Sequence, residues 1–195
     1  MENAIYTHAL TSGHFKVYSS RPDFIFHEVK QVHGIQCSYP TNTITEADAL
    51  IQTATDLTPM LIKTADCLPI FFEGEKENVF LHAGWRGLAS GILDIPELKQ
   101  IKPRTVFIGP AIHSCCFEVG SDFNKVFSQV LLIQRGDQFF ADLITFAKGR
   151  LQENFPDLVI TESGICTMCN EVFHSYRRNK TIYRNYNVYF PKDDK

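Results

Sequence analysis

Residues 79–91, with the sequence VFLHAGWRGLASG, join a short apolar run directly to side chains capable of chemistry. The run 79–81 predicts a buried strand, and the glycines that follow predict a tight turn before a helix. The backbone of such a turn can approach a ligand closely. We therefore expect His82, Trp85 and Arg86 to face one pocket, as candidates for a metal ligand, a stacking surface and a donor to anions.

Length and composition limit the class of protein. The chain has 195 residues, of which 44% are hydrophobic and 21% charged, so we expect one core and one domain over residues 1–195. A net charge of -3 argues against binding nucleic acid through a broad basic face. No apolar run approaches the length of a membrane span, so we do not expect a membrane protein.

The six cysteines do not by themselves indicate disulfide bridges, because a chain of this size does not need them. The start of the sequence lacks the basic and apolar segments of a signal peptide. We therefore expect reduced thiols and a cytoplasmic location.

Hydrophobic periodicity predicts several strands and three helices. Short apolar runs predict strands at 15–18, 24–26, 47–51, 59–62, 68–72, 105–108, 159–160 and 188–190. Apolar residues at helical spacing predict helices at 88–98, 121–131 and 142–155. The first of these is expected to end or break at Pro96, and the second to begin at the cap formed by Ser121 and Asp122.

Three side chains are candidates for a shared role as ligands of one metal ion. His33 precedes a glycine, Cys67 lies at a polar break between two apolar runs, and His82 ends the strand 79–81. Two imidazoles and one thiolate form the ligand set of a catalytic zinc site, with water in the fourth position. The alternative is structural: a hydrogen-bonded loop histidine and a small core cysteine. Their wide separation in sequence leaves both interpretations open.

The other thiols give a weaker signal. A single Cys-x-x-Cys at Cys166 and Cys169 is ambiguous, since a zinc ribbon needs a second pair at ribbon spacing. The adjacent Cys115 and Cys116 are not expected to bind one metal together or to pair with each other. We interpret Cys166 and Cys169 as buried structural thiols.

Several short blocks occur together and in order, and the chain resembles the YfiH family in them. This family is also called the laccase-domain or peptidoglycan-editing-factor family. The blocks are QVHG (31–34), ADAL (47–50), TADCLPI (64–70), HAGWRG (82–87), IGP (108–110) with CFEV (116–119), and SYRR (175–178).

The resemblance implies an α+β fold of mixed β-sheets packed with flanking helices, and a zinc ion held by His33, Cys67 and His82. It also implies purine nucleoside phosphorylase and adenosine deaminase activities, while older descriptions of the family name copper polyphenol oxidases. The chain departs from the family pattern by shorter segments before residue 33 and between residues 33 and 47. The glycine-arginine pair expected after the double arginine is replaced by residues 182–184, which places the C-terminal wall of the pocket and substrate choice in question.

Roles for the remaining residues follow from this resemblance and their chemistry. Asp66 is the candidate for moving protons, or alternatively orients a metal ligand. Arg86 suits bidentate binding of phosphate. Gln31 is a candidate for orienting a ribose or base, and Arg177 and Arg178 either recruit phosphate or pair with surface carboxylates.

Other classes of function stay open. Cys67 and His82 could act without metal as nucleophile and base of a cysteine hydrolase or amidase acting on cell-wall precursors. A laccase-like copper oxidase fits less well, because it needs many histidines and the chain has seven. A non-catalytic editing or binding protein is the third class. We expect small-molecule partners, a purine nucleoside and phosphate, while the choice between monomer and dimer stays open.

Overall fold

The computed structural model describes residues 3–192. The elements follow along the chain as β1 (Tyr6–Ala9), β2 (Gly13–Tyr18), β3 (His27–Glu28), β4 (Cys37–Ser38), β5 (Ala49–Thr53), β6 (Met60–Thr64), β7 (Leu68–Glu73), β8 (Glu77–Ala83), α1 (Trp85–Ala89), α2 (Pro96–Ile101), β9 (Thr105–Ile108), β10 (Glu118–Val119), β11 (Leu131–Arg135), β12 (Gln138–Asp142), α3 (Leu143–Asn154), β13 (Val159–Glu162), α4 (Tyr176–Asn179) and β14 (Asn185–Pro191). Two short 3-10 turns lie at Ile92–Asp94 and Phe123–Lys125.

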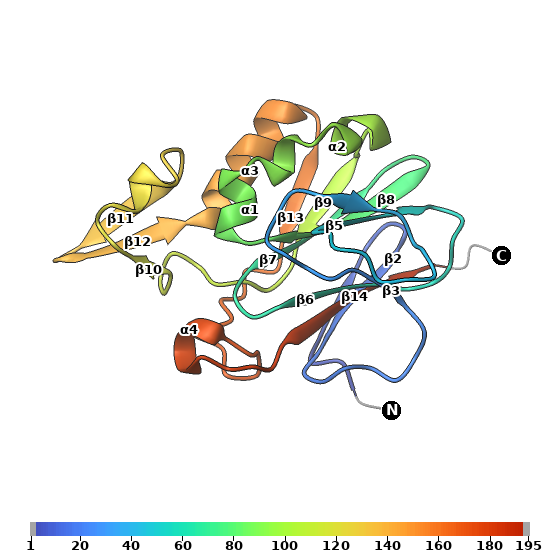
Figure 1. Ribbon diagram of the computed structural model, residues 1–195, viewed down its shortest axis with the longest axis horizontal. Coiled ribbons are helices and arrows are strands. Elements are labelled where there is room, and N and C mark those ends of the chain that lie inside the picture. Colours follow the sequence, from blue (N-terminus) through green and yellow to red (C-terminus); the bar gives the residue numbers. More distant parts are fainter. Residues whose placement is uncertain (1–2, 193–195) are drawn as a thin grey trace.

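Two mixed sheets form the body of the fold. The central sheet has the order β13-β9-β7-β8-β5-β4, and the outer sheet has the order β1-β2-β14-β6-β3. Parallel pairs, such as β13 with β9 and β3 with β6, stand among mainly antiparallel neighbours. Helices α1, α2 and α3 lie along one side of the central sheet, and the outer sheet lies on the other (Figure 1). The predicted α+β fold of mixed sheets and flanking helices is confirmed.

Side-chain alternation along β7 explains the layers. Ile70 and Phe72 belong to the core between the central sheet and the helices, whereas Phe71 belongs to the core between the two sheets. The ring of Phe71 stacks on Tyr189 of β14 at 4.1 Å between centroids. Successive residues of a strand point to opposite faces, so a strand covered on both sides is apolar throughout. Burying each such phenylalanine stabilises the fold by about 1.5–3 kcal/mol.

Two of the predicted helices differ from the structure. The expected helix 88–98 is replaced by α1, a 3-10 turn and α2, and Pro96 begins α2 instead of ending a helix. Proline is favoured in the first turn because its missing N–H has no intrahelical partner there. The helix expected at 142–155 is confirmed as α3, where the side chain of Asp142 caps Thr145 N at 2.9 Å.

The helix predicted at 121–131 is wrong. Its residues form a 3-10 turn followed by an irregular segment, and β11 begins at Leu131. The strand expected at 24–26 is also absent from this described stretch, because the pairing starts only at β3.

The strands β10, β12 and β11 form a small third sheet, the hairpin sheet, which extends away from the body (Figure 1).

Antiparallel pairing brings the chemically important segments together. Leu68 of β7 pairs with Ala83 of β8, so the residue before β7 and the turn after β8 lie at the same end of the central sheet. Strand β5 pairs with β8 on the other side, with Ala49 opposite Leu81.

No helix within residues 3–192 is both long and apolar enough to cross a membrane.

Candidate metal centre

Three donors predicted from the sequence meet at the end of β7 and β8. One ligand atom from each of His33, Cys67 and His82 lies within 4.8 Å of the others. The two imidazole rings are 4.7 Å apart between centroids and nearly perpendicular, at 80°. His82 is buried and His33 is exposed, so the group reaches from the core to the surface. The structure thus brings the three donors together, while their role as metal ligands stays a prediction.

The backbone around these donors is specialised. His33 and Asp66 have φ values of 61° and 95°, in a region that residues other than glycine seldom adopt. Such conformations cluster at functional sites, where the surrounding structure holds them. At Gly84, an added Cβ atom would lie 3.0 Å from Cys67 Sγ and 3.1 Å from His33 Cδ2. A larger residue at this position would therefore have to displace one or both donors by a few tenths of an ångström.

Asp48 organises the centre from beneath. It is fully buried, and its Oδ1 accepts a hydrogen bond from His82 Nδ1 at 2.7 Å. Its carboxylate also accepts the backbone N–H groups of Val32, His33 and Gly34 at 2.7 to 3.1 Å. One carboxylate thus shapes the His33 loop and fixes His82 with Nε2 left for a ligand, as in many metal sites.

The sequence analysis assigned no role to Asp48. The available signal was a charged residue inside the apolar run 47–51, just before β5. An aspartate is almost never fully buried unless it is paired. A carboxylate at such a position is therefore a candidate for orienting a histidine.

The charges of the centre support one another. Loss of solvation acts to raise the pKa of Cys67, but His82 and His33 lower it to about 6. Burial acts to lower the pKa of His82, but Cys67 and Asp48 raise it to about 9. The pKa of Asp48 is lowered, because hydrogen bonds from His82 and the loop outweigh its burial. The two imidazoles thus favour the thiolate form of Cys67, the form that binds metals or attacks electrophiles.

A cavity of about 700 Å³ opens over the centre, a size suited to a small-molecule ligand. Besides the three donors, its described lining contains five basic side chains and one carboxylate, that of Asp66. The basic residues are Lys30, Lys63, Arg86, Arg177 and Arg184. Ile182 and Arg184 line the same cavity, so the segment that departs from the family pattern forms part of the wall. The cavity is therefore suited to an anionic ligand.

Arg86 differs from the other cavity cations. Lys30 pairs with Glu46 at 2.8 Å, and Lys63 pairs with Glu28 at 3.1 Å. The guanidinium of Arg86 lies over the ring of Trp85, 4.5 Å from its centroid. Within residues 3–192, no group accepts a hydrogen bond from the Arg86 side chain. Its donors are therefore available to a ligand.

Asp66 lies in the cavity wall but is already engaged. Its Oδ1 accepts from Thr167 Oγ1 at 2.8 Å, and its Oδ2 accepts from Arg177 N at 2.7 Å. The guanidinium of Arg177 lies over Phe117 and donates to the carbonyl of Glu118. These contacts place Asp66 where it holds the C-terminal wall, and proton transfer by Asp66 stays a prediction.

Two residues expected to contact substrate have hydrogen-bond partners within the protein. Gln31 Nε2 donates to Lys63 O at 2.7 Å, and Gln31 Oε1 accepts from Lys63 N at 2.8 Å, so this amide extends the edge of β6. Arg178 donates to the carbonyls of Thr167, Met168 and Phe173 at 2.5 to 3.1 Å. Gln31 still borders the cavity, whereas Arg178 is absent from its described lining. Arg178 therefore holds backbone carbonyl groups, and phosphate binding by Arg178 stays a prediction.

The expectations for the remaining thiols need correction. Cys166 is buried as predicted, but Cys169 is exposed. The sulfurs of Cys115 and Cys116 are 3.4 Å apart and point to the same side, so adjacency does not prevent them from reaching a common partner. All four sulfurs lie within 4.8 Å of one another.

Known proteins share this sequence and fold. Residues 16–188 match the family described as multi-copper polyphenol oxidoreductase laccase. A purine nucleoside phosphorylase of Aquifex aeolicus is 36% identical over 145 residues, covering 71% of this chain and 68% of that protein. The purine nucleoside phosphorylase YfiH of Escherichia coli is 33% identical over 170 residues, covering 80% and 70%. A Neisseria meningitidis crystal structure has a TM-score of 0.72 and 26% identity, covering 86% of this chain and 75% of that one.

Proposed function

This chain belongs to the multi-copper polyphenol oxidoreductase laccase family, and we propose that it is a zinc-dependent purine nucleoside phosphorylase. The observation that carries the proposal is the group of three metal donors in the wall of a basic cavity, beside the available guanidinium of Arg86. The names of the Aquifex aeolicus and Escherichia coli relatives support the same activity.

His33, Cys67 and His82 would hold the ion through two imidazole nitrogens and one thiolate, a donor set that zinc accepts. A bound zinc ion supplies Lewis acidity, which polarises an oxygen ligand and lowers the pKa of a bound water to about 7. Three protein donors would leave one coordination position for an oxygen ligand, as in catalytic zinc sites. Asp48 keeps His82 in the orientation that this binding requires.

Phosphorolysis needs an anion held beside the sugar. An oxygen of phosphate forms a bond to C1′ of the ribose, the bond from C1′ to the purine nitrogen breaks, and the purine leaves with a proton. Arg86 is suited to orient the phosphate, because its planar fork can donate two parallel hydrogen bonds. Arg177 and Arg184 add positive charge on the C-terminal segment of the wall.

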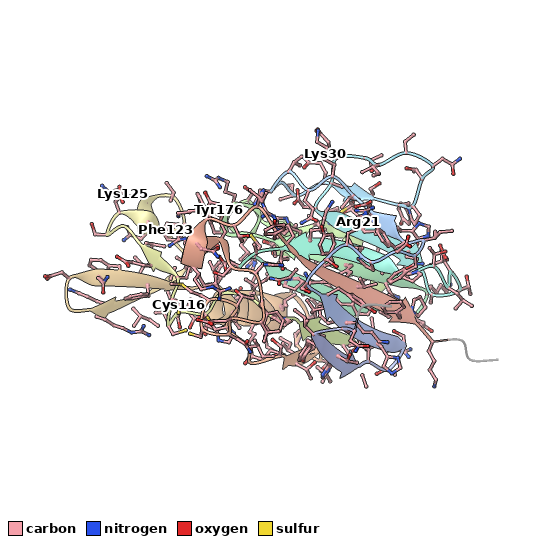
Figure 2. All side chains as sticks on the ribbon, turned by 90° about the horizontal axis from the view of Figure 1, so that it is seen from below. Arg21, Lys30, Cys116, Phe123, Lys125 and Tyr176 are labelled. Atoms are coloured by element: carbon pink, nitrogen blue, oxygen red, sulfur yellow. The ribbon has the colours of Figure 1, made fainter. Side chains whose placement is uncertain are left out.

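The purine base needs an aromatic or apolar surface. Tyr176 lines the cavity with a side chain that is 48% exposed, and Figure 2 labels it on α4. We assign the base to the side of Tyr176 and Ile182, and the phosphate to the side of Arg86. Asp66, with both oxygens already accepting hydrogen bonds, is assigned the positioning of Arg177.

A second candidate has its own observation. Cys67, His82 and Asp48 stand in the order of a nucleophile, a base and an orienting carboxylate, and the thiol is ionised at neutral pH. This arrangement would serve a metal-free cysteine hydrolase acting on an amide. Such an enzyme would keep its activity after chelation and lose it after alkylation of Cys67.

The test is incubation of the metal-loaded full chain with inosine, guanosine and adenosine, with and without phosphate, followed by chromatography of the products. Free purine that forms only with phosphate is the expected result, and its loss after chelation with return on adding zinc supports the metal. Inosine formed from adenosine would identify deamination as a further reaction of the same site. Turnover that survives complete metal removal, or oxidation of phenols by the copper-loaded chain without any phosphorolysis, would overturn the proposal.

A further inference from the structure

Four of the six cysteines gather at a place that the proposed function does not use. Their members are Cys115, Cys116, Cys166 and Cys169, and we call them the cysteine cluster. Cys116 and Cys169 have their sulfurs 3.2 Å apart, and Cys115 and Cys169 have theirs 3.6 Å apart. All four are free thiols in the structure. Figure 2 shows Cys116 beside the hairpin of β11 and β12, far from Lys30 at the cavity.

The spacing of these sulfurs matches a single tetrahedral ion. Zinc binds thiolates at about 2.3 Å, which places the sulfurs of a regular tetrahedron about 3.8 Å apart. The observed separations of 3.2 to 3.6 Å, within an outer limit of 4.8 Å, need only small side-chain adjustments. An iron–sulfur cluster spreads its cysteines over several iron atoms, so this compact group favours one ion.

The backbone holds the two halves of the cluster in register. Ala111 forms a parallel bridge with Cys166, and Thr167 N donates to Ala111 O at 2.9 Å. Each half is a tight turn, with Cys116 N bonded to His113 O at 2.9 Å and Asn170 N bonded to Cys166 O at 3.0 Å. His113 N also points at Cys166 Sγ at 3.4 Å, an N–H contact that stabilises a thiolate. Main-chain pairing therefore holds the two cysteine-bearing turns next to each other.

We propose that the cysteine cluster binds one zinc ion as a structural site, separate from the centre at His33, Cys67 and His82. Four thiolates fill the coordination shell, and such closed sites contribute to folding instead of catalysis. The proposal stands independently of the phosphorylase activity, because none of the four cysteines lines the described cavity.

The ion would fasten the C-terminal wall of the cavity. Cys116 is followed by Phe117 and Glu118, which receive the side chain of Arg177. Cys166 is followed by Thr167, which donates to Asp66. Joining the two turns through one ion therefore fixes residues on both sides of this wall.

The first experiment counts and identifies ions in the reduced, full-length protein. Native mass spectrometry of the zinc-loaded chain is expected to give about two ions per chain, one for each site. The double variant His33→Ala/Cys67→Ala is expected to retain one ion, with an X-ray absorption shell of sulfur alone at about 2.3 Å. Absence of that ion, or a shell containing nitrogen or oxygen, would overturn the proposal.

The second experiment needs no change at the first centre. Cys169 is exposed, so Cys169→Ser removes one thiolate without opening a cavity in the core. We expect this variant to lose one ion and to unfold at a lower temperature, whereas the matched control Cys37→Ser keeps both ions. The thiols of the unmodified zinc-loaded chain should also react slowly with a disulfide reagent until a strong chelator is added. Four fast-reacting cluster thiols, or a disulfide between Cys116 and Cys169 in the native protein, would contradict a zinc site.

Discussion

The candidate metal centre and the cysteine cluster both consist of side chains that can bind a metal, but they differ in donor number and in access to the cavity. The centre offers three donors, an open side toward a basic cavity and a buried carboxylate that orients one imidazole. The cluster offers four thiols on two tight turns, and none of them lines the described cavity. In zinc proteins generally, three protein donors with an open position are typical of catalytic sites, and four donors are typical of structural sites. Removing a donor from one site should therefore leave the ion of the other site bound.

The largest expected effect comes from removing a donor of the centre. Cys67→Ala should lower phosphorolysis by more than about a hundredfold, since even partners that only orient a ligand change activity or affinity by 10–100-fold. Steady-state kinetics and metal analysis measure this, and the ion of the cysteine cluster should be retained. A variant that loses both ions would show that the two sites are not independent.

The orienting carboxylate should give a smaller change. Asp48→Asn should weaken zinc binding at the centre by about 10–100-fold, because His82 loses its charged partner. Competition with a chromophoric chelator measures the affinity. Asp66→Asn is the matched control, a buried aspartate in the cavity wall that contacts Thr167 and Arg177, and its zinc affinity should be unchanged. Equal losses in both variants would argue against an orienting role for Asp48.

The anion contact can be tested without touching either ion. Arg86→Ala should raise the KM for phosphate by roughly tenfold or more, since a hydrogen bond to a charged group contributes about 1.5–3 kcal/mol. Both ions should remain bound. Arg104→Ala, which removes an arginine at a distant exposed pair with Glu75, is the control and should be neutral. An unchanged KM in Arg86→Ala would remove this residue from phosphate binding.

Zinc and protons should compete for the same donor atoms of the centre, so zinc affinity should depend on pH. The pKa of His82 is about 9, so zinc binding below that pH must displace one proton from the imidazole. The pKa of Cys67 is about 6, so the thiolate needs no deprotonation until the pH falls below that value. Zinc affinity of Cys169→Ser, which retains only the centre, should therefore rise about tenfold per pH unit from 6 to 9, and more steeply below 6. A flat profile from pH 6 to 9 would contradict the ionised pair.

The sequence predicted the parts of the fold whose periodicity is unambiguous. The strand 79–81 and the helix after Asp142 were found because a buried strand is continuously apolar and a capped helix has a clear start. The segment 121–131 misled because its apolar residues fit helical spacing, while Gly136 and Asp137, with Gly136 at φ 60°, turn the next strands into a hairpin. Helical spacing of apolar residues therefore gave the wrong element here, and the turn at Gly136 and Asp137 was the better indicator of the local structure.

The sites were predictable to different degrees. His33, Cys67 and His82 share no local spacing pattern, so their residue types suggested a zinc site but left a structural alternative open until the resemblance to a family was considered. Asp48 was missed because its partner lies 34 positions away. The cysteine cluster was missed because spacing rules for zinc ligands assume two Cys-x-x-Cys pairs, whereas here a parallel bridge at Ala111 joins unlike turns.

Strand order has a consequence for how the protein is made. Strand β14, at the C-terminal end of the described chain, lies between β2 and β6 in the outer sheet. During synthesis the three metal donors leave the ribosome long before β14 does, so a nascent chain carries the donors while that sheet still lacks its middle strand. Non-local strand pairing of this kind is slow and leaves sheet edges exposed. An ion captured early would bind a partly folded protein, and β14 would complete the outer sheet only after all three donors have been synthesised.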